Sequence, residues 1–385
     1  MRVKTLCHKL LSSTNIHQKR LTVLGEVLET VLDSKQLSVT TVGRKMKNTN
    51  QSRSNIRKVD RLYSNAHLYH EREIIYRTMA TWIINSPRPF IVVDGSKLPN
   101  SQCYTLRASV IAKGRALTVY ECTFTQAEYG SLKLYKRFLA GLGRVLPKDT
   151  VPILITDAEF RTPWFKEVYA LGWDFIGRVR GNAQCAMGDE DFIPCKDIFL
   201  TARQKPRCLG QGSLTASHDC DGYFYLYHRP KVGRHATKHC LKLNNKHHAE
   251  TANEPWLLFS SLEVNLAQHI IKAYEYRMTI EENFRDTKST RYGLALEMTF
   301  SKSHKRYAIM LLLAMLASVI AYLVGTLAEL KQWHYQFQAT STKNKRVLSR
   351  FFLGAEVLYK QLHFSLAEFL NALHFLQEEV YETFA

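Results

Sequence analysis

The chain has 385 residues, more than one simple core accommodates, so two or three packed domains are expected. It carries 53 lysines and arginines against 34 aspartates and glutamates, a formal net charge of +19. This balance argues against a cationic partner and favours a polyanion, with nucleic acid as the first candidate. A basic surface without a specific ligand and a membrane surface are the alternatives.

The N-terminal part, from Leu21 to about Ser86, has the apolar periodicity of packed helices. Within it, lysines and arginines stand among Asn, Ser and Thr, side chains that suit hydrogen bonds to phosphates and base edges. We interpret residues 1–86 as a small helical DNA-binding domain, with a merely solvated basic face as the alternative. The basic residues are Arg44, Lys45, Lys47, Arg53, Arg57, Lys58 and Arg61.

From Pro87 the pattern becomes mixed α/β. Runs rich in β-branched residues predict strands, amphipathic runs predict helices, and their order is βββαβαβ, with a hairpin turn at Lys113-Gly114. The expected elements are strands at Phe90–Asp94, Tyr104–Ala112 and Arg115–Phe124, a helix at Ser131–Leu146, a strand at Ile153–Asp157, a helix near Pro163–Leu171 and a strand at Trp173–Arg180.

Residues 181–255 break this rhythm with polar, His-rich sequence and one expected strand, Tyr223–His228, which indicates an inserted β-rich subdomain. A strand at Trp256–Phe259 and one long helix, Leu266–Lys288, are expected after it. The cysteines and histidines of the insertion match no zinc template, so we expect free thiols, no structural zinc and a reducing cytoplasm. They are Cys208, Cys220, Cys240, His218, His235 and His239.

The segment Tyr307–Gly325 is nearly all apolar and long enough to cross a bilayer. It directly follows basic polar sequence, and the chain has no second span of this kind. We therefore expect a buried core helix and no membrane partner, with a transmembrane helix as the alternative. Residues 327–385 are expected to be helical.

Two acids, Asp94 and Asp157, are each expected to close an apolar strand. Carboxylates suit hard cations, and a pair of Mg²⁺ ions can activate the attacking oxygen and stabilise the leaving oxygen of a phosphodiester. Without metal, clustered carboxylates would repel one another. Taken singly, however, an aspartate after a strand is more often a turn former or a helix cap.

A third acid, Glu281, lies in the predicted long helix together with Tyr274, Arg277 and Lys288. At about 100° per residue these four side chains fall within about 60° of one another, so one helix face presents a phenol, two cations and a carboxylate. The alternative is a solvent-facing helix in which Glu281 forms ion pairs with Arg277 or Arg285.

The spacing Tyr274-x2-Arg277-x3-Glu281-x6-Lys288 resembles the Tyr-Arg-Glu-Lys signature of DDE transposases in the IS-four family of insertion sequences. The likeness covers nearly the whole chain. It includes RKVDRLYSNAHL, IVVDGS, LRASVIAKGRALTVYE, ITDAEFRTPWF, GWDFIGRVRG, EPWLL and YEYRMTIEENFRDTKSTRYGL. One departure is Glu159, where relatives often carry Gly; we expect its side chain to face solvent, with an additional carboxylate around the metal site as the alternative.

The resemblance implies an α/β fold with a ribonuclease-H-like catalytic core over residues 87–326, interrupted by the insertion at 181–255. It also implies a C-terminal helical region, 327–385, with a possible role in dimerisation. The metal-binding catalytic triad would be Asp94, Asp157 and Glu281, holding two Mg²⁺ ions that Mn²⁺ can replace. The phosphate-binding residues would be Tyr274, Arg277, Lys288 and Arg285.

The resemblance further implies cut-and-paste transposition through a hairpin on the transposon end, with Trp256 stacking a flipped base; a core Trp is the alternative. The implied partners are double-stranded DNA, as terminal inverted repeats and target, a second copy of the chain in a synaptic complex, and possible host DNA-bending factors. Two other functions stay open: a domesticated DNA-binding protein without catalysis, and a plain ribonuclease-H-like nuclease.

Overall fold

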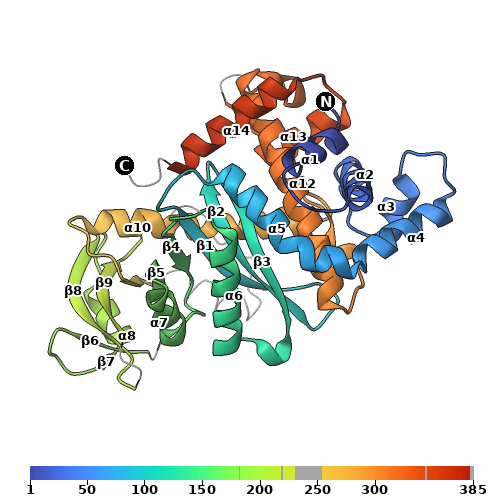
Figure 1. Cartoon of the computed structure of the whole chain (residues 1–385). Helices are drawn as coiled ribbons and strands as arrows, with labels where there is room; N and C mark the ends of the chain where they lie inside the picture. Colours follow the sequence, from blue (N-terminus) through green and yellow to red (C-terminus); the bar gives the residue numbers. More distant parts are fainter. Residues whose placement is uncertain (182, 218–219, 230–253, 343–344, 382–385) are drawn as a thin grey trace, which may run out of the picture. The chain divides into compact units, whose positions relative to one another are not determined.

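The computed structural model describes residues 1–181, 183–217, 220–229, 254–342 and 345–381 (Figure 1). By packing, the chain divides into two compact units. The first comprises Met1–Thr150 and Met278–Ala385, and the second comprises Val151–Arg277. The boundaries of these units differ from those of the three regions predicted from the sequence, because the predicted catalytic region 87–326 is divided between both units. The roles of the three regions stay a prediction.

The first unit contains a three-stranded antiparallel sheet with the order β3-β2-β1. Its strands are β1, Phe90–Lys97; β2, Cys103–Ala112; and β3, Arg115–Thr125. All three were predicted, but β1 continues three residues beyond Asp94, so this acid lies inside the strand rather than at its end. The reason is that Gly95, Ser96 and Lys97 continue the ladder opposite β2.

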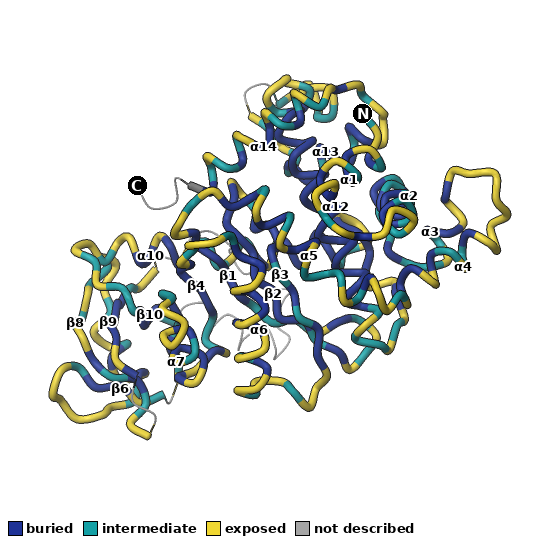
Figure 2. Tube along the Cα trace, viewed as in Figure 1, coloured by how far each residue is buried: buried dark blue, intermediate teal, exposed yellow. Residues whose placement is uncertain are grey.

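The core of the first unit is helix α12, His304–Leu330, which has 22 buried residues in an unbroken run (Figure 2). Its composition would allow it to cross a membrane, but the apolar stretch is wholly buried inside the molecule. An all-round apolar helix has no face for water, so it must be covered on every side. The prediction of a buried core helix over Tyr307–Gly325 is confirmed.

The predicted N-terminal and C-terminal helices are present in the first unit, and several of them pack on α12. They are α1, Val3–Leu10; α2, Gln18–Ser34; α3, Val39–Lys45; α4, Ser52–Tyr63; α5, Ala66–Ile83; α13, Arg350–Tyr359; and α14, Leu366–Tyr381. The first unit also contains α6, Leu132–Val145, and α11, Thr279–Lys288.

The second unit contains a sheet with the order β4-β5-β10-β9-β8-β6-β7, in which β4 and β5 are parallel and the other described neighbours are antiparallel. The described residues of region 181–255 contain strands β6 to β9, which extend the sheet through β10. That this region is an inserted subdomain stays a prediction. The elements are β4, Ile153–Thr156; α7, Thr162–Ala170; β5, Asp174–Val179; β6, Gln184–Met187; β7, Ile193–Pro194; α8, Cys195–Ile198; β8, Arg207–Leu214; β9, Cys220–Tyr227; β10, Trp256–Ser260; and α10, Ala267–Glu275.

The long helix predicted over Leu266–Lys288 is interrupted. Helix α10 ends at Glu275, a 3₁₀ turn covers Tyr276–Met278, and α11 begins at Thr279. The turn has no buried residue, so no packing in the core favours α-helical geometry over 3₁₀ geometry at these positions. Because a 3₁₀ turn advances about 120° per residue, the prediction of one continuous helical face is wrong.

Helices α12 and α13 cross with their backbones in contact. A Cβ atom on Gly354 would lie 1.8 Å from the Ala321 carbonyl oxygen, and one on Gly325 would lie 1.9 Å from the Arg350 carbonyl oxygen. Real side-chain contacts never approach so closely, so the crossing requires glycine on both helices.

The substitution Gly354→Ala should therefore lower the free energy of unfolding by about 1–3 kcal/mol, because the helices must separate. The matched control is Gly25→Ala in α2, where the new Cβ would lie 3.3 Å from the flexible Lys4 Cγ. That variant should be neutral or gain up to about 1 kcal/mol from helix propensity. Urea unfolding measures both, and equal stabilities for the two variants would contradict the packing account.

Candidate active site

In the first unit, strand β1 and helix α11 bring together Asp94 and Lys288. The half-buried Asp94 carboxylate accepts the Gly95 N–H at 2.8 Å. The Lys288 ammonium donates to Ser96 Oγ at 2.5 Å and to the Lys97 carbonyl oxygen at 2.9 Å, which ties the end of α11 to β1. Burial lowers the pKa of Lys288 to about 8, and the nearby Asp94 carboxylate opposes this shift.

Glu281 lies in the first turn of α11 and is exposed. The neighbouring Glu282 forms ion pairs with Arg285 and, at 3.6 Å, with Arg115. Arg285, predicted to bind phosphate, therefore has a carboxylate partner in this structure.

A buried cation, Arg107, joins α11 to the sheet. Its side chain is 1% exposed and forms an ion pair with Glu121 at 2.7 Å from Nε to Oε1. Its other end donates to Asn283 Oδ1 in α11, and Asn283 Nδ2 donates to the Ala116 carbonyl oxygen at 2.9 Å. In the sheet register, Arg107 is opposite Asp94 on one side and Glu121 on the other. The network therefore fixes the helix that carries Glu281 against the strand that carries Asp94.

In the second unit, Asp157 directly follows β4, as predicted, and accepts the Glu159 N–H at 2.9 Å. Burial raises the pKa of Asp157 and the Glu159 carboxylate adds to the shift, whereas Arg277 and Arg178 oppose it. Glu159 itself is exposed, as expected. The structure thus brings two cations near the second acid.

Tyr274 is buried in the second unit, with its ring 5.0 Å from that of Trp256 in an edge-to-face arrangement. Desolvation raises the pKa of Tyr274 to about 12, and the charges of Arg277 and Arg178 oppose the shift. The phenol therefore stays protonated at neutral pH and can donate a hydrogen bond.

Trp256 begins β10 and is 9% exposed. Besides Tyr274, the ring of Tyr227 lies 6.0 Å away, and the Arg229 guanidinium lies 5.6 Å from the centre of the indole. In this structure Trp256 is a packed residue, in line with the core alternative. Its role toward a flipped base stays a prediction.

The sequence analysis did not single out Arg178 and Arg180, although both lie near the Tyr274 hydroxyl and their charges lower its pKa. They occupy alternate positions of strand β5 and its end, and both contact Glu254, at 3.4 and 2.5 Å. The signal was present in GWDFIGRVRG, because residues two apart on a strand point to the same face. A fixed pair of guanidinium groups on one face suits a phosphate.

The family model described as "Transposase DDE domain" matches residues 85–319, more than half of the chain. The chain belongs to this family of DDE transposases. A comparison with curated proteins found no match. Membership identifies the protein in general terms as a DNA transposase, an enzyme of the nuclease and strand-transferase type that acts on DNA. Members of the family generally use divalent metal ions.

No group of three or more His, Cys, Asp or Glu side chains is spaced to hold a metal ion among the residues that the structure describes. In this transposase, Asp94 and Glu281 belong to the first unit and Asp157 to the second. Each acid is located on its own element, and the convergence of the three stays a prediction.

The predicted zinc-free insertion is described only in part. The cysteines within the described residues, including Cys208 and Cys220, form no disulfide there. Cys240, His218, His235 and His239 lie outside the described residues.

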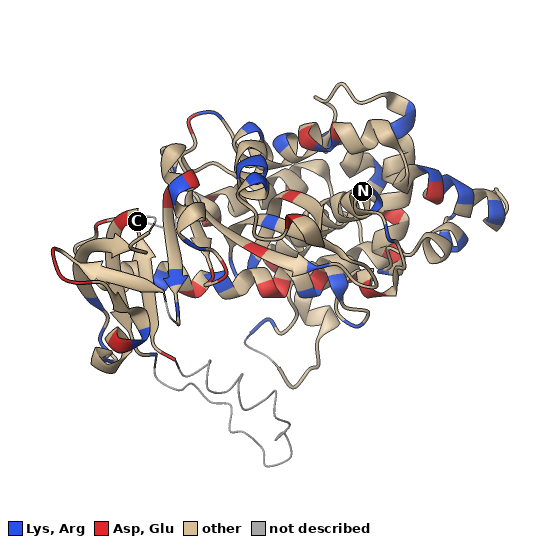
Figure 3. Cartoon of the chain, turned by 90° about the horizontal axis from the view of Figure 1, so that it is seen from below, with Lys and Arg blue, Asp and Glu red and all other residues tan. Residues whose placement is uncertain are grey.

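The basic residues predicted to bind transposon ends cluster on helices α3 and α4 of the transposase and on the loop between them (Figure 3). Helix α4 packs so closely on α3 that a Cβ atom on Gly43 would lie 2.5 Å from the Ile56 Cα. The loop is fixed by paired amide hydrogen bonds of 3.1 and 2.9 Å between Asn48 and Asn55. The exposed members are Arg44, Lys45, Lys47, Arg53, Arg57 and Arg61.

Two of the predicted end-binding cations have acidic partners. Lys58 is half-buried and pairs with Glu26 at 3.2 Å, so it supports the packing of α4 on α2. Lys47 is 71% exposed and pairs with Asp33 at 2.7 Å. An exposed pair of this kind exchanges readily for a phosphate, since it contributes little stability.

The Arg107 network makes a testable prediction about stability. Arg107→Met leaves the buried Glu121 carboxylate without its cation and should lower the free energy of unfolding by about 3–5 kcal/mol. The double variant Arg107→Met/Glu121→Met removes both charges and should recover most of that loss. Urea unfolding of the single and double variants tests this coupling, and simply additive losses would contradict it.

Proposed function

We propose that the chain is a cut-and-paste DNA transposase in which Asp94, Asp157 and Glu281 converge on one scissile phosphodiester. The observation that carries the proposal is the match to the transposase DDE domain over residues 85–319, a span that contains all three acids. Their positions in a strand, directly after a strand and in the first turn of a helix support it, because regular elements hold catalytic side chains firmly.

The three acids fit a divalent metal by their chemistry, since carboxylate oxygens are the ligands that Mg²⁺ and Mn²⁺ accept. Burial disfavours the charged form of Asp157, and a bound cation would compensate this cost. Two Mg²⁺ ions would supply activation of the attacking oxygen and stabilisation of the leaving oxygen. Mn²⁺ can substitute.

The neighbouring donors are suited to hold the DNA backbone at the cut. Tyr274 offers a protonated hydroxyl, and Arg277 lies close enough to shift its pKa. Lys288 offers an ammonium group beside Asp94. Arg285, which is itself exposed, reaches a phosphate by exchanging its half-buried partner Glu282. These side chains orient the phosphodiester, and charge-assisted hydrogen bonds of this type are short and strong.

The reaction follows the scheme implied by the likeness to the IS-four family and to the transposase of the tetracycline-resistance transposon. Water attacks one strand at the transposon end and frees a 3′-hydroxyl. This hydroxyl attacks the opposite strand and forms a hairpin, which a second water reopens. The 3′ end then joins target DNA. Each step is an in-line displacement at phosphorus, so one ribonuclease-H-like site serves all of them.

The exposed cations of α3 and α4 bind the terminal inverted repeats, since their side chains suit phosphates and base edges. The working form is a homodimer across two paired ends, with the C-terminal region 327–385 contributing to the dimer. Host DNA-bending factors can assist the pairing. The protein acts in the cytoplasm on the nucleoid, without a membrane partner.

Replacing any one acid of the proposed triad, for example Glu281→Gln, should abolish cleavage of a labelled transposon end while leaving binding of that end within about twofold. The matched control is Glu159→Gln, which removes an exposed carboxylate beside Asp157 and should keep most of the activity. EDTA should stop cleavage by the unmodified protein. Cleavage that survives Asp94→Asn, Asp157→Asn or Glu281→Gln would contradict the proposal.

The role of Trp256 can be separated from that of the acids. Trp256→Ala should leave first-strand nicking within a few-fold and reduce hairpin formation at least about tenfold, because a stacked base is worth about 1–3 kcal/mol. Gel analysis of nicked and hairpin products measures both steps. Trp256→Phe, which keeps an aromatic face, is the control. Equal loss of nicking and hairpin formation would instead show that Trp256 only supports the fold around Tyr274.

A further inference from the structure

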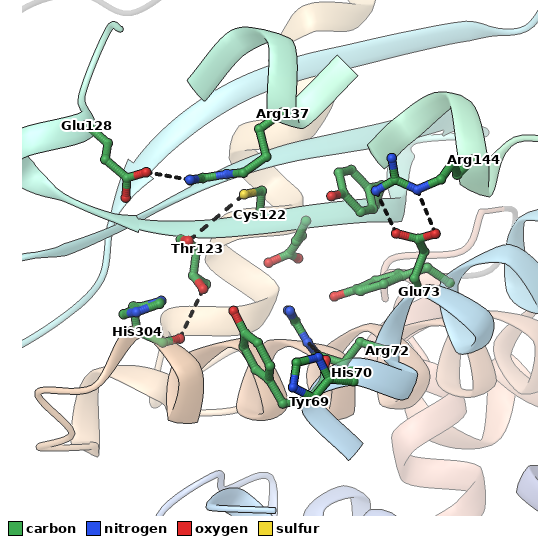
Figure 4. Close-up of a pocket in the computed structure, with 13 residues that line it drawn as sticks. Tyr69, His70, Arg72, Glu73, Cys122, Thr123, Glu128, Arg137, Arg144 and His304 are labelled. Carbon is green, nitrogen blue, oxygen red and sulfur yellow. Dashed lines mark hydrogen bonds and ion pairs between the residues drawn. The ribbon is translucent and has the colours of Figure 1, made fainter. Parts of the chain in front are cut away.

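A polar cavity of about 330 Å³ lies in the first unit and shares one lining residue, Glu121, with the Arg107 network (Figure 4). Its lining comes from helix α5, strand β3, the 3₁₀ turn Gln126–Glu128, helix α6 and the first residue of α12. Most of its lining is polar: three arginines, three glutamates, two histidines and three tyrosines. Such a lining does not suit an apolar ligand, so the charges decide what the cavity can hold.

Each carboxylate of the lining already has its own guanidinium group. Glu73 is held by both Nε and Nη2 of Arg144, at 2.8 and 2.9 Å. Glu128 pairs with Arg137 at 2.5 Å, and the dashed lines of Figure 4 mark these two pairs. The third carboxylate, Glu121, pairs with Arg107, which lies outside the lining. The three acids are thus neutralised.

One cation of the lining is left over. Arg72 donates from Nε to the Tyr69 carbonyl oxygen at 2.8 Å, and its guanidinium lies 4.0 Å from the centre of the Tyr69 ring. These contacts fix the direction of the guanidinium plane. Within the described part of the chain, its two terminal nitrogens form no hydrogen bond and no ion pair. A guanidinium group that is fixed in direction and has both terminal nitrogens available as donors can bind a phosphate through two parallel hydrogen bonds.

Two further polar groups of the lining lack partners among the described residues. The Tyr76 side chain is 1% exposed, and its hydroxyl has no hydrogen-bond partner. Nδ1 of His304, at the first residue of α12, is buried and has none. A buried donor without a partner costs about 1–3 kcal/mol, which a ligand oxygen would recover. The positive end of the α12 dipole lies at His304 and favours an anion.

The cavity is also close to the strand that carries the first acid. Within the sheet, Glu121 of β3 is opposite Arg107 of β2, which is opposite Asp94 of β1. Neighbouring strands are about 4.8 Å apart, so Glu121 lies roughly 10 Å from Asp94 across the sheet. DNA cut at Asp94 would therefore bring other backbone phosphates of the same strand within reach.

We propose that this cavity receives a backbone phosphate of the bound DNA, held by Arg72 together with Tyr76 and His304. This inference rests on the proposed function, because the phosphate belongs to the DNA that the transposase is proposed to bind. Contact with a phosphate is independent of base sequence, so the cavity contributes affinity and positions the strand without reading it. A free phosphate ion offers the same chemistry, and the experiment separates the two sources.

The first arm measures DNA binding by the full chain at several salt concentrations, with a duplex that ends in the terminal inverted repeat and without divalent metal. Arg72→Gln should weaken binding about tenfold and reduce the slope of log K against log salt by about 0.9, the value of one lost phosphate contact. Arg72→Lys keeps the charge and should retain most of the slope. Lys148→Gln, an exposed cation between α6 and β4, is the control and should change neither quantity.

A second variant separates ligand binding from folding. Tyr76→Phe removes a hydroxyl that has no partner in the described structure, so the free protein should keep or gain thermal stability. The same variant should weaken DNA binding several-fold. A hydroxyl with a merely structural role would give the opposite pattern, with lower stability and unchanged binding, and that result would overturn the assignment.

The last arm uses inorganic phosphate against chloride at matched ionic strength. Phosphate should raise the melting temperature of the unmodified protein and not that of Arg72→Gln. If phosphate stabilises but the salt slope is unchanged in Arg72→Gln, the cavity binds a free ion and the DNA assignment fails. If neither arm responds to Arg72→Gln, there is no site. If the unmodified protein binds no transposon end, the proposed function fails, while the phosphate arm still tests the cavity.

Discussion

A single buried guanidinium fixes the geometry on which the candidate active site depends. Arg107 joins Glu121 of β3 to Asn283 of α11, and its strand neighbour is Asp94. A charge in the core is tolerated only where it is paired and hydrogen-bonded, so its partners cannot move far without a large cost. The position of α11, and with it Glu281 and Lys288, is therefore set from inside the first unit, and the hydrogen bonds of Lys288 to β1 add to it.

Each unit has cations beside one of its acids, and this charge pattern suits an enzyme that binds a polyanion near carboxylates. In the first unit Lys288 lies beside Asp94, and in the second unit Arg277 and Arg178 act on Asp157. Without metal, carboxylates and phosphates would repel one another. Membership of the transposase family, whose members generally use divalent ions, gives this arrangement a physical explanation.

Much of the fold was predictable because its signals are local. The βββαβαβ order and the all-apolar core helix follow from periodicity and composition alone. The break in the helix at Tyr276–Met278 could not be predicted, because the sequence on both sides of it has helical periodicity. What distinguishes these three residues is that none of them is buried, and this is seen only in the structure. Likewise, Asp94 looked like a strand end because Gly95 and Ser96 are turn formers, but pairing with β2 extends the strand. That Arg72 has no carboxylate partner in the cavity follows from the pairing of the three glutamates with other arginines. No sequence pattern predicts this pairing.

The central claim, that three acids distant in sequence hold the same metal ions, is tested most directly by Fe²⁺ cleavage mapping. Fe²⁺ takes the place of Mg²⁺, and hydroxyl radicals produced with ascorbate cut the backbone close to the bound ion. The account predicts cuts near Asp94, Asp157 and Glu281 together in the DNA complex, all suppressed by excess Mg²⁺. Cuts at only one or two of these segments, or cuts that Mg²⁺ does not suppress, would contradict it.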